Sequence, residues 1–252
     1  MAPVKLNVVA FAGASNLPLW AGQAQGIFAE HSVDLVLGLT PNSRAMARDL
    51  YDGHFDLAFT SVDNIVAYDE GQGEAELAGP ADFVALFGVD DGMLNVMAAA
   101  EFGTLADLRG RCVSVDAMTT GFAFVLWEIL GREGLADSVE WVAVGGGAQR
   151  LAALLDGAQA ATLLNTPLVA WLDTHREEAA ATLSARANMP LPVATRATAA
   201  LLDPAHGLLR DLRIDKNGLR NVLRLRSAHA TPRQEPHEIS RYLDHSIRDA
   251  LN

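Results

Sequence analysis

The chain is short of the residues that mark several special classes of protein. Among its 252 residues is a single cysteine, Cys112, so no disulfide can form within the chain. The cysteine lies in a short apolar run, which predicts a buried strand position rather than a reactive thiol. No run approaches the roughly 20 apolar residues of a membrane-spanning helix. Basic residues number 19 against 31 acidic ones, and a net charge of -12 argues against a nucleic-acid partner.

Motifs of the common catalytic and cofactor sites are missing as well. The chain has neither the Gly-x-Ser-x-Gly elbow of a serine hydrolase nor a Walker phosphate-binding loop. The glycine-rich run Gly145–Arg150 has an arginine where the dinucleotide fingerprint requires its third glycine. The seven histidines show no metal-ligand spacing. The sequence therefore predicts no cofactor and no metal, and it disfavours a hydrolase.

What the chain does contain is one helix, turn and strand unit written twice, at Ala45–Ser61 and Leu151–Pro167. In each copy an apolar helix face ends at Asp-Gly, where glycine can adopt the left-handed conformation that closes a helix. A short apolar strand follows and ends in small polar residues. Because ligands of open α/β sheets bind at the carboxyl ends of strands, the repeat predicts two lobes that face one cleft.

Apolar runs of strand length alternate with helical patterns, which is typical of βαβ units with parallel strands. Two extended runs, Phe83–Phe87 and Leu94–Ala99, interrupt the alternation and predict a hairpin or a crossing strand. The alternation starts afresh at Thr104, and two prolines near residue 190 are expected to return the chain to the first lobe. We predict an α/β fold with one lobe at residues 1–92 and 190–252 and a second lobe at residues 93–189.

The two ends of the chain carry further patterns. Leu6–Ala14 could pass for the core of a signal peptide, but only Lys5 precedes it, and the run is better interpreted as the first strand. The compartment stays open: periplasmic if a signal was removed from the native protein, otherwise cytoplasmic. Near the other end, Asn217–Arg226 and Glu238–Leu251 have helical patterns, and the second of these is expected to pack through an apolar stripe.

Four segments resemble the type II periplasmic solute-binding proteins of the nitrate, sulfonate and taurine group of ABC transporters, which are related to thiamine-pyrimidine synthases. They are Leu17–Leu35, Asp52–Ala58, Leu105–Val115, and Leu130–Leu135 followed by Gly145–Gly147 and the second Asp-Gly unit. The resemblance implies a two-lobed α/β fold, with mixed sheets flanked by helices, that closes over a small molecule between its lobes.

The chain departs from the family pattern in two respects. The second unit has Ala160 where the first has Asp56, so the second lobe lacks the usual acidic residue of the motif. The single cysteine also rules out the cysteine-rich site of the pyrimidine synthases.

Candidate ligand-binding residues follow the predicted strands. The strongest group is Thr119, Thr120, Gly121 and Phe122, because a capped helix amino terminus offers free N–H groups to an anion. The matching residues elsewhere are Asn16, Trp20, Thr60, Ser61, Asn64, Asn165 and Thr166. Each has a purely structural alternative: a helix cap for the polar residues, a place in the core for Trp20. No arginine lies in these turns, which makes a nitrate or sulfonate ligand less attractive than a small organic acid or a neutral polar molecule.

These patterns favour a non-catalytic protein that binds a small organic acid or polar molecule, and the resemblance implies that it is the substrate-binding component of an ABC-type uptake system with a permease as its partner. The alternative is a cytoplasmic lyase, a decarboxylase or dehydratase, on the same fold. In that case Asp63 and Asp116, which follow strands leading to the cleft, are the candidate acid and base. Solvated or capping carboxylates are the plainer interpretation of both.

Overall fold

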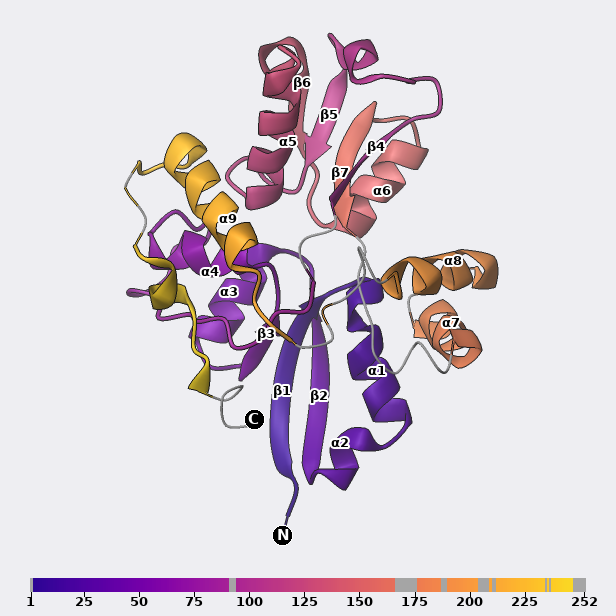
Figure 1. Ribbon diagram of the computed structural model, residues 1–252, viewed down its shortest axis with the longest axis vertical. Helices are drawn as coiled ribbons and strands as arrows, with labels where there is room; N and C mark the ends of the chain where they lie inside the picture. The colour runs from indigo at the N-terminus through magenta and orange to yellow at the C-terminus, as the bar shows by residue number, and fades with distance from the viewer. Residues whose placement is uncertain are drawn as a thin grey trace.

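Two β-sheets, each with its own helices, form the described part of the chain (Figure 1). The computed structural model describes residues 2–90, 94–165, 176–186, 190–203, 209, 212–233, 235 and 237–246. We call the three-stranded sheet and the helices packed on it the first lobe, and the four-stranded sheet with its helices the second lobe. The two-lobed α/β architecture expected from the sequence is confirmed. No described helix has the length and apolar character needed to cross a membrane.

The first lobe is built on a parallel sheet in the order β2-β1-β3. Its strands are β1 (Val4–Phe11), β2 (Val33–Thr40) and β3 (Leu57–Phe59). The helices between and after them are α1 (Leu17–Ala24), α2 (Ile27–Glu30), α3 (Ser43–Tyr51) and α4 (Val62–Asp69), with a 3-10 turn at Ala14–Asn16. Because the strands are parallel, the polar residues that follow each of them lie at one edge of the sheet.

The second lobe has a mixed sheet in the order β4-β7-β5-β6, in which β4 is antiparallel to β7. Its strands are β4 (Leu94–Ala98), β5 (Cys112–Val115), β6 (Glu140–Ala143) and β7 (Ala161–Asn165). Its helices are α5 (Gly121–Arg132) and α6 (Gly147–Leu155), with 3-10 turns at Leu105–Leu108 and Ala136–Ser138. Leu126 and Leu130 of α5 are fully buried against Val113 of β5 and Leu163 of β7, which fixes the helix on the sheet.

The repeated unit of the sequence is also a repeated structure. Helices α3 and α6 both end at Asp-Gly, and the glycines Gly53 and Gly157 have φ angles of 73° and 71°, in the left-handed region. The next strands, β3 and β7, each join their sheet in parallel, β3 beside β1 and β7 beside β5. The repeat is therefore confirmed as a matched helix–strand unit in each lobe.

The difference between the two copies at Asp56 and Ala160 has a local explanation. In the first lobe the Asp56 carboxylate accepts hydrogen bonds from the Asn7 backbone N–H (2.8 Å) and side chain (3.1 Å), which tie β3 to β1. In the second lobe Ala160 makes the corresponding backbone contact, donating its N–H to the Cys112 carbonyl at 2.8 Å, and its side chain is buried in the core. In the second lobe the buried Ala160 side chain takes the place of the hydrogen bonds that Asp56 makes with Asn7.

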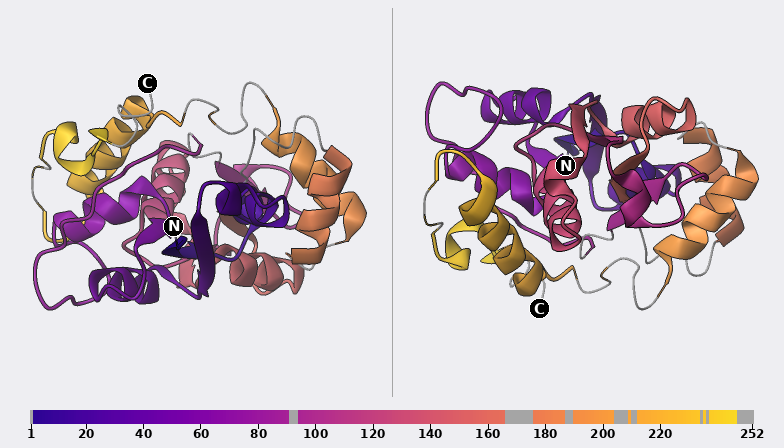
Figure 2. Two further views of the ribbon diagram at one scale, coloured as in Figure 1. Left: turned by 90° about the horizontal axis from the view of Figure 1, so that it is seen from below. Right: turned by 90° about the horizontal axis from the view of Figure 1, so that it is seen from above.

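Beyond β7 the chain returns to the first lobe on both of its flanks (Figures 1 and 2). On one flank α7 (Arg176–Arg186) and α8 (Leu191–Leu201) pack against α1, with Leu183 buried in a cluster that includes Leu17 and Trp20. On the other flank α9 (Lys216–His229) contacts both α4 and α5. The lobe boundary near residue 190 stays a prediction, and this packing favours a boundary that precedes α7.

Two local expectations differ from the structure in part. Of the two alternatives for residues 83–87, the hairpin with β4 is wrong: their pairing is a single parallel bridge between Ala85 and Leu243, and β4 pairs with β7. Within the predicted helix at 238–251, residues 239–242 form a short 3-10 turn, after which Leu243 is extended; residues 247–251 lie outside the described part. Pairing with a distant segment overrides the local helical pattern in this stretch.

The C-terminal segment is anchored on the end of α4. The Tyr242 hydroxyl donates to the Glu70 carboxylate, and Arg241 forms a two-pronged pair with Asp69, its Nε 2.7 Å from Oδ2 and its Nη2 2.9 Å from Oδ1. Burial and the adjacent Glu70 carboxylate raise the pKa of Tyr242 well above its usual value, so the hydroxyl keeps the proton that it donates. His237 adds a contact of 2.8 Å between its Nδ1 and Glu70. These contacts hold the end of the described chain against the first lobe.

Candidate functional site

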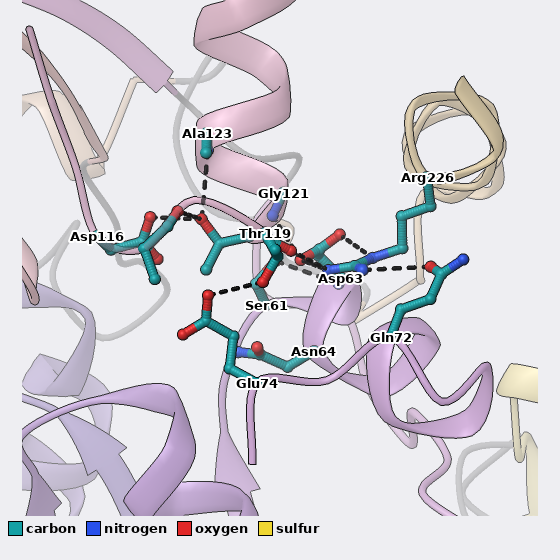
Figure 3. Close-up of polar contacts among 12 residues, drawn as sticks. Ser61, Asp63, Asn64, Gln72, Glu74, Asp116, Thr119, Gly121, Ala123 and Arg226 are labelled. Carbon is teal, nitrogen blue, oxygen red and sulfur yellow. Dashed lines mark hydrogen bonds and ion pairs between the residues drawn. The ribbon is translucent and has the colours of Figure 1, made fainter. Parts of the chain in front are cut away.

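The two lobes meet at the amino terminus of α5, where the Asp63 side chain of α4 points toward Gly121 (Figure 3). Thr120 has an extended backbone, and its hydroxyl accepts from the Ala123 N–H at 3.3 Å, so α5 begins directly after it. Ser61 does the same for α4, accepting from the Asp63 N–H at 3.3 Å. Each helix begins just after a strand of its own lobe. The first turns of α4 and α5 contact each other through Asp63 and Gly121.

The Asp63 carboxylate joins α4, α5 and α9. Its Oδ2 accepts from the Gly121 N–H at 2.7 Å and from Arg226 Nη2 at 2.7 Å, while its Oδ1 accepts from Arg226 Nε at 2.7 Å. Asp63 is 6% exposed and Arg226 is 1% exposed. A carboxylate is favourable at a helix amino terminus, and the planar guanidinium matches it with two parallel bonds. Asp63 and Arg226 therefore neutralise each other's charge, and the Asp63 carboxylate also binds the Gly121 N–H of the second lobe.

A second carboxylate of the first lobe makes a parallel contact. The Thr119 hydroxyl donates to Glu74 Oε1 at 2.6 Å, and Arg44 Nε lies 3.3 Å from Glu74 Oε2. Glu74 is on the loop that follows α4, Arg44 is in the first turn of α3, and Thr119 precedes α5. One carboxylate therefore bridges a cation of the first lobe and a hydroxyl of the second.

Little space is left beside these contacts. The described residues around them enclose a cavity of about 10 Å³, enough for at most one water molecule. It is lined by residues that include Ser43, Asn64, Tyr68, Gln72 and Thr120. At this point the polar groups of the two lobes bind each other.

Two charged residues, the half-buried Asp116 and the buried Arg150, lie behind the cap of α5. The Thr120 hydroxyl donates to Asp116 Oδ1 at 2.5 Å, and burial raises the pKa of Asp116 against the opposing effects of Thr120 and Arg150. Arg150 donates from Nη1 to the Gly145 carbonyl at 2.6 Å and from Nη2 to the Leu163 carbonyl at 3.0 Å. Burial lowers the pKa of Arg150, and Asp116 opposes that effect. Arg150 thus links the glycine-rich turn to β7.

Replacing Asp116 by asparagine is expected to change how stability depends on pH. A carboxyl whose pKa is raised in the folded state binds its proton more tightly there than in the unfolded chain, so it lowers stability as pH rises above the unfolded pKa. The free energy of unfolding of Asp116→Asn, relative to the parent protein, should therefore increase from about pH 3 to about pH 7. Urea denaturation at several pH values measures this difference.

Asp107→Asn is the matched control with the opposite sign. Backbone and side-chain hydrogen bonds from Thr104 hold the pKa of Asp107 below its usual value, so its carboxylate adds stability above the unfolded pKa and loses it as pH falls. Its relative unfolding free energy should decrease over the same range. A flat profile for Asp116→Asn beside a falling one for Asp107→Asn would contradict the raised pKa of Asp116.

The structure brings together many of the residues singled out in the sequence. Thr119, Thr120 and Gly121 gather at the interlobe contact, and Phe122 lies beside them with its ring centroid 5.9 Å from Arg150 Cζ. In the first lobe Ser61 caps α4, and the Asn64 side chain, which lines the cavity, donates to the Thr60 hydroxyl at 2.8 Å. Contact of these residues with a ligand stays a prediction.

The remaining candidates lie elsewhere. Asn16 is fully buried and donates from Nδ2 to the Phe11 carbonyl at 2.7 Å, and Trp20 packs in the core cluster of α1, α7 and α8. Asn165 ends β7, and Thr166 lies outside the described residues. Of the two carboxylates suggested for catalysis, Asp63 has both oxygens engaged by Arg226 and Gly121, and Asp116 accepts from Thr120.

Sequence reasoning missed the polar and charged residues that complete the site, namely Arg44, Gln72, Glu74, Arg150 and Arg226. The predicted ligand turns contain no arginine, but α9 supplies one from outside them: Arg226 Nη2 lies 3.4 Å from the Thr119 carbonyl. A signal was available: Arg226 follows Leu219 and Val222 on the same helix face, seven and four positions later, and a charged residue on an apolar stripe indicates a buried partner.

No protein-family model and no curated protein matches the chain. Solved structures do match it over nearly its full length. A protein of Bordetella bronchiseptica RB50 is 18% identical with a TM-score of 0.69, covering 100% of this chain and 98% of its own. The alkanesulfonate-binding protein SsuA of Xanthomonas axonopodis pv. citri, bound to MOPS, is 15% identical with a TM-score of 0.68. The match covers 96% of this chain and 97% of SsuA. A zinc-bound ligand-binding component of an ABC-type import system from Staphylococcus aureus is 12% identical with a TM-score of 0.70, covering 99% of each chain.

These likenesses establish the architecture. The chain has the type II periplasmic-binding-protein fold found in the sulfonate-binding proteins, as its sequence resemblance implied. At these levels of identity the likeness concerns the fold, and function must be argued from the site.

Proposed function

We propose that the protein is a solute-binding protein that closes its two lobes on a small organic acid or another small polar molecule. The observation that carries this proposal is the pair of hydrogen bonds across the cleft, from Gly121 N–H to Asp63 and from the Thr119 hydroxyl to Glu74. Both bonds join a polar group of one lobe to a polar group of the other, which supports a ligand site shared by the two lobes. Lobe closure around a ligand at such a junction is a common form of conformational change in two-lobed proteins.

The finer part of the proposal concerns the partner. Two proteins with this fold are named as an alkanesulfonate-binding protein and as the ligand-binding component of an ABC-type import system. By analogy we assign this chain the same place, handing its ligand to a permease, with the periplasm as its compartment. Purified permease complex, reconstituted in vesicles, should bind the ligand-loaded protein more tightly than the ligand-free one.

A ligand screen tests the binding function. Small carboxylic acids, sulfonates and thiamine-type pyrimidines are added to the purified protein, and melting temperature is measured. A true ligand at 100 times its dissociation constant stabilises the folded state by about 2.7 kcal/mol, which corresponds to a rise of roughly 5–10 °C for a chain of this size. Thr119→Val removes the hydroxyl of the second lobe. It should lower ligand affinity at least tenfold and make the rise in melting temperature correspondingly smaller.

Thr195→Val is the matched control, since Thr195 is an exposed threonine of α8 whose hydroxyl donates to the Leu191 carbonyl. It should leave ligand affinity unchanged. Ligands that bind equally well to the parent protein and to Thr119→Val would place the binding site outside this cleft and overturn the proposal.

A lyase is the second candidate function, and Asp116 favours it. A carboxyl with a raised pKa at the edge of a cleft is suited to act as a general acid, and Asp63 is unsuited to the role of free base while both of its oxygens are engaged. Mass spectrometry of every compound that raises the melting temperature separates the two functions. Recovery of the intact compound supports binding, and its conversion supports the enzyme.

A further inference from the structure

The Glu74 carboxylate occupies an unusual position for an acidic side chain. It lies between the lobes, where it accepts from the Thr119 hydroxyl at 2.6 Å and faces Arg44 Nε at 3.3 Å. The Glu74 side chain is 16% exposed, so it is mostly withdrawn from solvent, whereas Arg44 is 60% exposed. A carboxylate held by one hydroxyl and one guanidinium has the contacts expected of a bound organic acid.

The backbone on both sides of Glu74 is fixed without help from its carboxylate. Gln72 donates its N–H to the Ala67 carbonyl at 2.7 Å, and the Ala75 N–H donates to the Tyr68 hydroxyl at 3.2 Å. Gly73 packs so tightly on the Tyr68 ring that an added Cβ would lie 2.3 Å from ring carbons. The loop therefore presents the Glu74 side chain to the cleft from a rigid base.

The two interlobe carboxylates differ in how firmly they are held. Asp63 is gripped by two bonds from the buried Arg226 and by a backbone N–H, and breaking such a pair is expensive. Glu74 has a neutral hydroxyl and a largely exposed guanidinium as partners, and an ion pair of that kind contributes little. Glu74 is the carboxylate that another anion can replace.

We propose that Glu74 is an internal stand-in for the ligand: its carboxylate occupies a carboxylate-binding subsite formed by Thr119 and Arg44, and the ligand's own carboxylate replaces it there. This inference rests on the proposed function, because it assigns the ligand class of the same cleft. Two consequences follow. The ligand is a carboxylic acid with at least one ionised carboxylate, and each binding event must displace Glu74, which lowers the apparent affinity.

Chemical complementation with acetate tests the subsite. Glu74→Ala removes a CH₂–COO⁻ group, whose shape and charge acetate restores. We expect acetate at ten times its dissociation constant to raise the melting temperature of Glu74→Ala by about 3–6 °C, with saturation, and the parent protein to show no saturable rise. Acetamide, which has the same shape without the charge, should have no effect on either protein. Adding Thr119→Val to Glu74→Ala should abolish the acetate response.

Glu76→Ala is the matched control, because Glu76 is an exposed acid two positions along the same loop. It should behave like the parent protein. The inference is overturned if folded Glu74→Ala responds to acetate no more than Glu76→Ala does, or if acetamide acts equally well.

A second variant covers the case in which the alanine protein does not fold. Glu74→Gln keeps the size of the side chain and removes its charge, so it should bind a carboxylate found in the ligand screen about tenfold more tightly than the parent protein does. Equal or weaker binding overturns the inference. A different outcome would show that the proposed function fails while the inference about Glu74 holds. In that case no compound of the screen binds the parent protein, but acetate still stabilises Glu74→Ala.

Discussion

Replacing Asp63 by alanine should lower the free energy of unfolding by about 3–5 kcal/mol, because it leaves the Arg226 guanidinium buried without its counter-charge. Arg226→Met, which strands the carboxylate instead, should have an effect of the same order. For a chain of this size a loss of that magnitude lowers the melting temperature by roughly 10 °C. Thermal and urea denaturation of the two variants provide the measurement.

The double variant and a surface control sharpen this test. Asp63→Ala combined with Arg226→Met should be less destabilising than the sum of the two single changes, since the second change removes the charge that the first leaves unpaired. Arg220→Met removes an exposed arginine of the same helix, whose Nη1 donates to Asn217, and it should cost less than about 0.5 kcal/mol. Strict additivity of the two single effects would show that Asp63 and Arg226 are not coupled.

Gly121→Ala should force the lobes apart. A Cβ atom at this position would lie 2.4 Å from Asp63 Cγ and 2.6 Å from its Oδ1, and the carboxylate cannot withdraw because Arg226 holds both of its oxygens. We expect overpacking to lower the free energy of unfolding by about 1–3 kcal/mol and the radius of gyration in solution scattering to increase. Affinity for any ligand that requires closure should fall more than tenfold, by calorimetric titration.

Gly131→Ala is the control on the same helix. A Cβ at Gly131 would lie 4.0 Å from Ala136 Cβ, which is ordinary contact, so the change should stabilise the protein by about 0.5–1 kcal/mol through helix propensity. The lobes should close as in the parent protein. If Gly121→Ala behaves like Gly131→Ala, the contact between Asp63 and α5 does not control closure.

The parts of the fold that could be predicted from sequence are those set by local chemistry. The paired Asp-Gly turns, with Gly53 and Gly157 in the left-handed conformation, and the capping threonine Thr120 are encoded within a few residues. The stretches whose predicted structure differs from the observed one, residues 83–87 and 238–245, are those whose partners lie far away, as in the bridge between Ala85 and Leu243. Periodicity within a segment carries no information about such a partner.

The same distinction separates the predicted from the missed site residues. Thr119, Thr120 and Gly121 could be placed at the cleft because they follow a strand and begin a helix. Glu74 lies on a loop without regular structure, and Arg226 is on a helix that the sequence predicted at Asn217–Arg226 without assigning it to the site. Both reach the site through tertiary contacts with Thr119 and Asp63. The pattern of α9 indicates that Arg226 has a buried partner, but it does not identify that partner.

The anchoring of the C-terminal segment on α4 determines the order in which the protein can fold as it is synthesised. Asp63 is separated from Arg226 by 163 positions, and Asp69 from Arg241 by 172. The sheet of strands β4 to β7 lies wholly between these partners, so a growing chain can complete it while α4 still lacks its cations. The first lobe is therefore synthesised first but completed last. The Asp63 carboxylate stays solvated until α9, which carries Arg226, has been synthesised.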